Sequence, residues 1–74
     1  MTEVAPRIII NPKIRFGKPV IKGTRVPVDF IVGKIAGGMT IEEVAKEYDL
    51  KREDIFAALR YAAQLMKKEN LIYV

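Results

Sequence analysis

The sequence predicts a mainly α-helical fold, in which a bundle of three helices with a helix-turn-helix pattern follows a small N-terminal β element. All four prolines lie within the first 27 residues, where they prevent a long helix. Beyond that point apolar residues recur three and four positions apart, which is the spacing of one helix face. The 74 residues make one small domain. We divide it into a turn-rich extended segment over 7–26, a helical body over 27–69 and a C-terminal strand or tail over 70–74.

The N-terminal segment consists of short extended pieces separated by turns. Arg7 to Ile10 is rich in β-branched residues and lies between two prolines, which predicts a short strand. Asn11 precedes a proline and is expected in a turn, because proline disfavours the helical region for the residue before it. Val20 and Ile21, between a proline and a glycine, form a second extended piece.

The first two helices have recognisable ends. Pro27 is expected to begin the first helix, because its fixed φ suits a first turn. Gly37 and Gly38 are expected to end that helix. Thr40 and Glu43 have the spacing of a capping box, which predicts that the second helix begins there and runs to about residue 48.

The third helix is expected over 52–69, and the last residues are β-prone. Its predicted core face consists of Ile55, Ala58, Leu59, Ala62 and Met66. Its apolar surface extends beyond one stripe, as expected where a second chain packs, through Phe56, Ala63 and Leu65. We expect a C-terminal strand that binds a partner, or pairs with residues 7–10, over Leu71, Ile72, Tyr73 and Val74.

The chain contains neither cysteine nor histidine. This excludes disulfides, thiol nucleophiles, histidine acid–base catalysis and the common zinc sites. Two pairs of adjacent carboxylates, at 42–43 and 53–54, lie in first turns of predicted helices, where capping and the helix dipole account for them. We therefore expect no enzyme activity, no cofactor and no metal. A domain of this size buries only about 60–65% of its unfolded surface, so we expect a homo-oligomer, a dimer or larger.

The charge balance is moderately basic. Thirteen basic residues against nine acidic ones give a net charge of +4 and a pI near 9.6. This suits nucleic acid or an acidic protein partner, and it equally suits a soluble domain with a lysine-rich surface. No apolar run approaches the roughly 18 residues of a membrane span, and the N-terminus lacks the basic and apolar stretches of a signal peptide. We expect a cytoplasmic protein that does not enter a membrane.

The second and third predicted helices, with the turn between them, match a helix-turn-helix pair. If the third helix lies in a major groove, Lys51, Arg52 and Arg60 are expected to contact phosphates or bases. The two acidic residues that follow Arg52 suit a DNA backbone poorly. In the alternative interpretation these acids complement the helix dipole, and Phe56 is a contact between two copies of the chain.

A second basic group precedes the first helix: Lys13, Arg15, Lys18, Lys22 and Arg25. Gly17 and Gly23 lie among these residues, and glycines with lysines can bind phosphates. The order does not match a nucleotide-binding P-loop, because Lys18 precedes the second glycine and no strand leads directly into a helix. We interpret the segment as turns in which the glycines adopt positive φ.

The run over residues 10–28, INPKIRFGKPVIKGTRVPV, resembles the hallmark of domain-of-unknown-function family 433, a family of short bacterial and archaeal proteins. The resemblance covers about residues 8–66 and includes GMTIEE at 38–43 and AALRYA at 57–62. The matching motif positions are Gly17, Lys18, Pro19, Ile21, Gly23, Thr24, Arg25 and Pro27. The resemblance implies a homeodomain-like helical fold with a small N-terminal β element, and a VapB-type antitoxin encoded beside a PIN-like toxin nuclease. It implies no catalytic role for the motif, which we interpret as architectural.

One position departs from the family's pattern, because Lys51 stands where a threonine or serine usually opens the last helix. Losing that cap is expected to cost about 1 kcal/mol. A lysine also adds positive charge to a helix end that is already positive. This favours a phosphate or an acidic partner near Lys51 and Arg52.

Two functional hypotheses follow. The first is a non-catalytic antitoxin-like module that binds a PIN-like nuclease and, as a further expectation, its own promoter DNA. The second is a homo-oligomeric interaction or scaffold domain that does not bind DNA. In the second hypothesis Phe56, Ala57 and Ala63 lie in the interface between copies and cover the face that would otherwise contact DNA.

Overall fold

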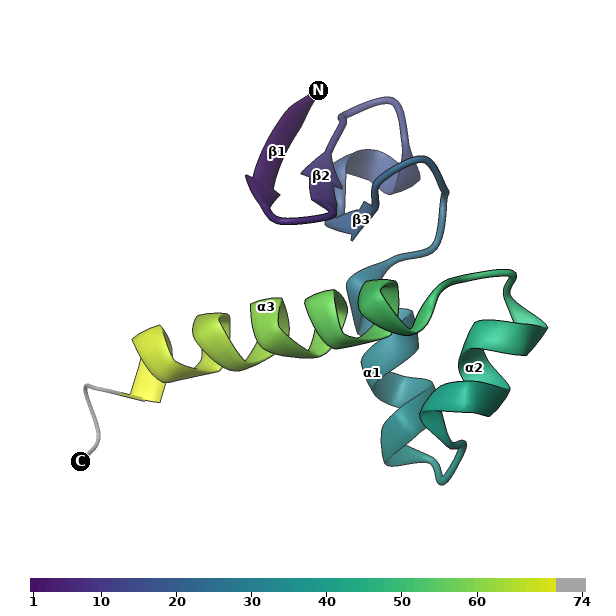
Figure 1. The fold of residues 1–74 in the computed structure, drawn as a ribbon. Coiled ribbons are helices and arrows are strands. Elements are labelled where there is room, and N and C mark those ends of the chain that lie inside the picture. The colour runs from purple at the N-terminus through teal and green to yellow at the C-terminus, as the bar shows by residue number, and fades with distance from the viewer. Residues whose placement is uncertain (71–74) are drawn as a thin grey trace.

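The computed structural model describes residues 1–70 and has a small antiparallel sheet followed by three α-helices (Figure 1). The elements, in chain order, are β1 (Thr2–Ala5), β2 (Ile8–Ile10), the 3₁₀ turn η1 (Arg15–Gly17), β3 (Val20–Ile21), α1 (Val28–Ala36), α2 (Ile41–Glu47) and α3 (Arg52–Asn70). The predicted helices and the two predicted extended pieces are confirmed, with ends that differ by about one residue. Within the described part of the chain, no helix is both long and apolar enough to cross a membrane.

The sheet has one more strand than the sequence predicted. Its order is β1-β2-β3, and both pairings are antiparallel. A register shift in β1 between Glu3 and Ala5 marks a bulge. Arg7 does not extend β2 but turns the chain between β1 and β2, with a φ of 69°. The predicted strand over 71–74 lies outside the described residues. Both edges of β2 are occupied, by β1 and β3.

Helix α1 ends as its glycines predict. Gly38 has a φ of 111°, a left-handed conformation that an ordinary side chain rarely adopts. Its N–H donates to the Ile35 carbonyl at 3.0 Å, and the Met39 N–H donates to the Lys34 carbonyl at 3.1 Å. This is the Schellman arrangement, which satisfies carbonyls that the end of the helix would leave unpaired.

Helix α2 begins with a capping box and ends at a residue in the left-handed conformation. The Thr40 hydroxyl accepts the Glu43 N–H at 3.1 Å, and the Glu43 carboxylate accepts the Thr40 N–H at 2.8 Å, which confirms the capping box. At the other end Asp49 adopts a φ of 55°, and the Leu50 N–H donates to the Ala45 carbonyl at 2.8 Å. Asp49 therefore takes the left-handed position that glycine usually occupies after a helix.

The core lies where the helices meet one face of the sheet. It contains Ile8, Ile21, Val28, Ile31, Val44, Ile55, Ala57 and Ala58. Helix α3 packs on α1, α2 and β2 with its first half only, and its second half extends away from the rest of the molecule (Figure 1). Met66 lies on that second half and is 62% exposed, so its predicted place in the core is wrong. No described element covers this turn of the helix.

Candidate functional site

The candidate site is an apolar groove between the start of α1 and the extended half of α3. The groove has a volume of about 320 Å³ and is lined by Pro19, Val28, Asp29, Val32, Tyr61, Ala62, Leu65 and Met66. Leu65 and Met66 remain 43% and 62% exposed on its helical wall. Exposed apolar side chains beside a preformed groove are typical of a surface that binds another molecule.

The groove has few polar groups. Asp29 is its one charged lining residue, and Lys18 pairs with it at 3.0 Å on the exposed rim. Tyr61 supplies the one hydroxyl among the lining side chains. Elsewhere in the described residues, no group of three or more histidine, cysteine, aspartate or glutamate side chains could hold a metal ion. The arrangement can bind apolar side chains and orient a polar group at one edge.

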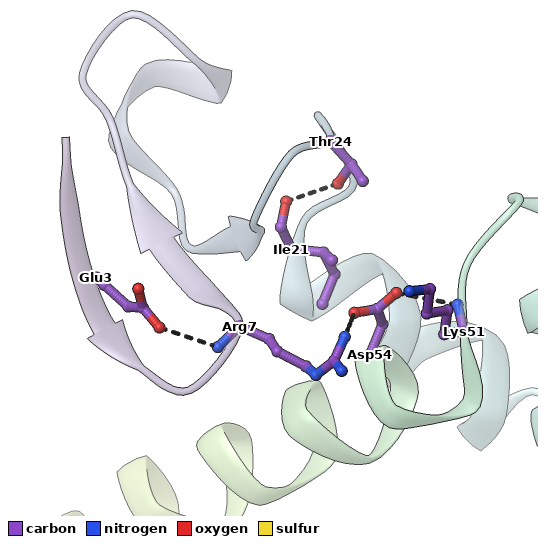
Figure 2. Close-up of polar contacts among 6 residues, drawn as sticks. All are labelled: Glu3, Arg7, Ile21, Thr24, Lys51 and Asp54. Carbon is purple, nitrogen blue, oxygen red and sulfur yellow. Dashed lines mark hydrogen bonds and ion pairs between the residues drawn. The ribbon is translucent and has the colours of Figure 1, made fainter.

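A polar clamp joins the sheet to α3 (Figure 2). Arg7 reaches from the β1–β2 turn to Asp54, with its Nη1 2.9 Å from the Asp54 Oδ1. The other Asp54 oxygen accepts the backbone N–H of Lys51 at 2.9 Å. Asp54 therefore supplies the reciprocal half of a capping box, although Lys51 replaces the usual serine or threonine. An anion is expected at this helix end. The Asp54 carboxylate lies there and contacts the backbone N–H of Lys51.

The three predicted DNA-contacting residues do not converge on one face. Arg52 pairs with Glu42 of α2, and its guanidinium lies 5.4 Å from the centroid of the Phe56 ring. Lys51 and Arg60 are nine residues apart, which turns them about 180° from each other around α3. Both side chains are exposed. DNA contact by these residues stays a prediction, and the geometry does not bring them together.

The predicted dimer residues Phe56 and Ala63 do share a face of α3. They are seven residues apart, which places them within about 20° of each other around the helix. Phe56 is 37% exposed and Ala63 is exposed. Ala57 is only 3% exposed and belongs to the core, so its predicted place in the interface is wrong. The remaining predicted interface residues, 71–74, lie outside the described part of the chain.

The glycines and Thr24 of the sequence motif build turns, as the architectural interpretation expects. Gly17 and Gly23 have φ values of 83° and 82°. The Thr24 hydroxyl donates to the Ile21 carbonyl at 2.8 Å and accepts the Val26 N–H at 3.0 Å (Figure 2 shows the first bond). The Thr24 N–H also donates to the Ile21 carbonyl, so Gly23 occupies the left-handed position of a four-residue turn.

The other motif positions divide into buried and exposed residues. Ile21 and Pro27 are buried, and the Pro19 carbonyl accepts the N–H of Val28 at 2.9 Å to start α1. The exposed Lys18 is the residue that pairs with Asp29. In the described structure the Arg25 side chain has no hydrogen-bond or ion-pair partner, which an architectural role does not explain.

Two features near the sheet were missed from the sequence. One is the Arg7–Asp54 pair, which joins residues 47 positions apart and has no local signal in the sequence. The other is Phe16, whose side chain is fully exposed. No feature of the sequence indicates that exposure, because phenylalanine is usually a buried residue.

Glu3 on β1 has an altered acidity. Its carboxylate accepts a hydrogen bond from Lys22 Nζ at 3.2 Å and another from the backbone N–H of Arg7 at 3.3 Å. The Lys22 hydrogen bond, the Arg7 N–H and the positive charge of Lys22 together lower the pKa of Glu3. The Glu3 side chain lies on the surface and holds β1 to the turn at Lys22.

Comparison with known proteins identifies the family. Residues 8–62 match the model of the family described as protein of unknown function (DUF433). The chain belongs to this family. A DUF433 protein from Anabaena variabilis has a crystal structure with a TM-score of 0.77 and 32% identity over 84% of this chain and 62% of its own.

Two further relatives are more distant or shorter matches. The crystal structure of Rv2018 from Mycobacterium tuberculosis superimposes with a TM-score of 0.65 and 29% identity, over 70% of this chain and 24% of its own. An uncharacterized protein from Archaeoglobus fulgidus is 61% identical over 23 residues, which are 31% of this chain and 64% of that protein. The DUF433 chain thus spans less than two thirds of each of the three relatives it matches.

Proposed function

We propose that this chain is a non-catalytic, antitoxin-like binding module that holds a PIN-like nuclease in the groove between α1 and α3. The observation that supports the proposal is the apolar groove itself, which continues onto the exposed side chains of Leu65 and Met66. The nuclease as partner comes from the family resemblance. The proposal also includes a homeodomain-like classification of the fold and a cytoplasmic location of the protein.

The chemistry of the groove indicates what part of the partner would bind there. Its floor accepts aliphatic or aromatic side chains, because it is lined almost entirely by apolar residues. Lys67 and Lys68 follow on the last described turns of α3 and are exposed. A partner segment that carries apolar residues with acidic neighbours complements both features.

The test is co-purification with any PIN-like nuclease that is encoded beside the gene for this chain. Leu65→Glu and Met66→Glu each place a charge in the groove and are expected to weaken the complex at least tenfold, since burying an unpaired charge costs more than about 1.4 kcal/mol. Gln64→Glu adds the same charge on the exposed side of α3 and is the matched control. Circular dichroism checks that each variant stays folded.

The readouts are complex mass by light scattering and inhibition of RNA cleavage by the nuclease. Wild-type protein that leaves the nuclease fully active would contradict the proposal. So would equal binding by Met66→Glu and Gln64→Glu. The absence of any such nuclease gene beside this one would count against it as well.

Promoter binding belongs to the same proposal as a secondary activity. It requires Lys51, Arg52 and Arg60 to contact phosphates from different sides of α3, with Arg52 released from Glu42. Duplex affinity that barely changes between about 50 and 200 mM salt would exclude several phosphate contacts. Binding of the duplex is measured separately from binding of the nuclease.

The second candidate is a homo-oligomeric scaffold, and it is favoured by the shared exposed face of Phe56 and Ala63. In this case Phe56→Glu is expected to convert an oligomer into monomers, because a charge replaces an apolar contact. Sedimentation velocity distinguishes the oligomer from the monomer. A Phe56→Glu variant that keeps the wild-type mass would contradict the scaffold.

A further inference from the structure

The loop between β2 and β3 presents one phenyl ring to solvent. Phe16 has a relative exposure of 101% and a φ of 57°. Its neighbours Arg15 and Gly17 also have positive φ values, of 51° and 83°. Three successive residues are therefore left-handed, and two of them are not glycine. The loop lies at the sheet end of the molecule, away from α2 and from the extended half of α3 (Figure 1).

Hydrogen bonds hold the loop in this conformation. The Gly17 N–H donates to the Ile14 carbonyl and the Lys18 N–H to the Arg15 carbonyl, both at 3.1 Å. The Ile14 N–H donates to the Asn11 carbonyl at 2.8 Å. The Arg15 Nε donates to the Arg25 carbonyl at 3.1 Å, which joins the loop to the turn before α1. The ring is thus presented on a defined, cross-linked backbone.

The exposure of Phe16 does not contribute to the stability of the fold. A left-handed residue with a side chain is strained, and a fully exposed phenyl ring recovers none of that strain through burial. Strained conformations that a fold maintains without a packing gain are found at binding sites. The ring and its conformation therefore need an explanation outside the monomer.

The segment of the chain that carries the ring is strongly positive. No acidic residue lies between Glu3 and Asp29, whereas six basic residues do: Arg7, Lys13, Arg15, Lys18, Lys22 and Arg25. The rest of the chain carries seven basic residues against nine acidic ones, so the net positive charge of the protein arises from this segment. Ion pairs within the chain engage three of the six, Arg7, Lys18 and Lys22. Lys13, Arg15 and Arg25 pair with no carboxylate of the described residues.

We propose that this loop binds single-stranded nucleic acid, with a base stacked on Phe16 and phosphates at Lys13, Arg15 and Arg25. Single-stranded nucleic acid has flat bases with free π-faces and regularly spaced negative phosphates. An exposed ring can stack on the bases, and unpaired cations can contact the phosphates. In a duplex the bases already stack on each other and offer no free face to the ring. An acidic peptide supplies the charge without the planar group.

Fluorescence anisotropy with labelled oligothymidylate and oligouridylate of about 12 nucleotides tests the proposal. A duplex of the same length and polyglutamate are the competitors. Wild-type protein is expected to bind the single strands, with affinity falling about 20-fold between about 50 and 200 mM salt for three phosphate contacts. The comparison of the two oligomers shows whether RNA or DNA is preferred, and either preference supports the proposal.

Phe16→Gly separates binding from folding. Glycine suits a φ of 57°, so this variant is expected to be at least as stable as the wild type in urea unfolding. It should nevertheless lose about tenfold in affinity for the single strands. Arg25→Gln should reduce the slope of log affinity against log salt by about 0.7. Lys46→Gln on α2 removes the same charge far from the loop and should leave the slope less changed.

Three results would overturn the inference. In the first, Phe16→Gly binds single strands as tightly as the wild type does. In the second, the protein binds the duplex as tightly as the single strands. In the third, polyglutamate competes fully with the oligonucleotide. The groove variant Met66→Glu should retain oligonucleotide binding, because Met66 lies on the extended half of α3. Failure of nuclease binding would therefore leave this inference standing, and failure of oligonucleotide binding would leave the nuclease proposal standing.

Discussion

The Arg7 guanidinium lies 2.9 Å from the Asp54 carboxylate, although 47 residues separate them in the sequence. The pair fastens the β1–β2 turn to the first turn of α3. Asp54 is the more enclosed partner, with 13% of its side chain exposed against 42% for Arg7. Since Asp54 also accepts the Lys51 N–H, one carboxylate both caps a helix and docks the sheet on it.

This double role predicts unequal effects of removing the two partners. Asp54→Ala is expected to lower the free energy of unfolding by about 1–2 kcal/mol, because it removes a cap bond and an ion pair together. Arg7→Met should cost less than about 1 kcal/mol, because the arginine is half exposed. Glu53→Ala, in the same turn, is the control and should change stability by no more than about 0.5 kcal/mol. Urea unfolding measures all three, and an equal loss at Arg7 and Asp54 would refute the capping role.

The turn between α2 and α3 depends on the backbone of Asp49. Because its φ is 55°, Asp49→Val is expected to destabilise the protein by about 1–2 kcal/mol. Asp49→Gly and Asp49→Asn tolerate the same conformation and should lie within about 1 kcal/mol of the wild type. Thermal unfolding of the three variants tests this. A valine that is as stable as glycine at this position would show that the turn does not need the left-handed residue.

Ile8 connects the sheet to the helical core. It is fully buried and belongs to the cluster that includes Ile21 and Ile31. Ile8→Ala is expected to cost about 2–5 kcal/mol, a large fraction of the stability of a domain of this size. Ile10→Ala, at a half-buried position of the same strand, is the control and should cost less. A chemical unfolding curve for Ile8→Ala that overlays the wild type would mean that the sheet does not contribute to the core.

Glu3 should titrate below the ordinary pH range of a glutamate, because Lys22 and the Arg7 N–H stabilise its charged form. A lowered pKa in the folded state means that this contribution to stability is present above the ordinary glutamate pKa. It is lost as the pH falls through the folded pKa. NMR titration of the Glu3 side-chain carboxyl measures this pKa. Lys22→Met should move the pKa back toward its ordinary value, whereas Lys46→Met should not, and a wild-type Glu3 that already titrates normally would contradict the contact.

Much of the fold could be predicted because its signals are local. A capping box at Thr40 and Glu43 and a glycine such as Gly38 act within four or five residues, so their effect is visible in a short window of sequence. The turns of the motif, built around Gly17 and Gly23, are of the same kind. The candidate groove was predicted only in part, through the apolar excess at Leu65 on the third helix.

The sequence by itself determined the three helices, their ends and the turn-rich start of the chain, because each depends on backbone preferences and hydrogen bonds between near neighbours. Only the tertiary structure decided which side chains meet: Arg7 with Asp54, Lys22 with Glu3, and Arg52 with Glu42. It also decided that Met66 lies beyond the packed part of α3 and that Phe16 stands free in solvent. Periodicity identifies the apolar face of a helix, but how much of that face is covered depends on where distant elements end.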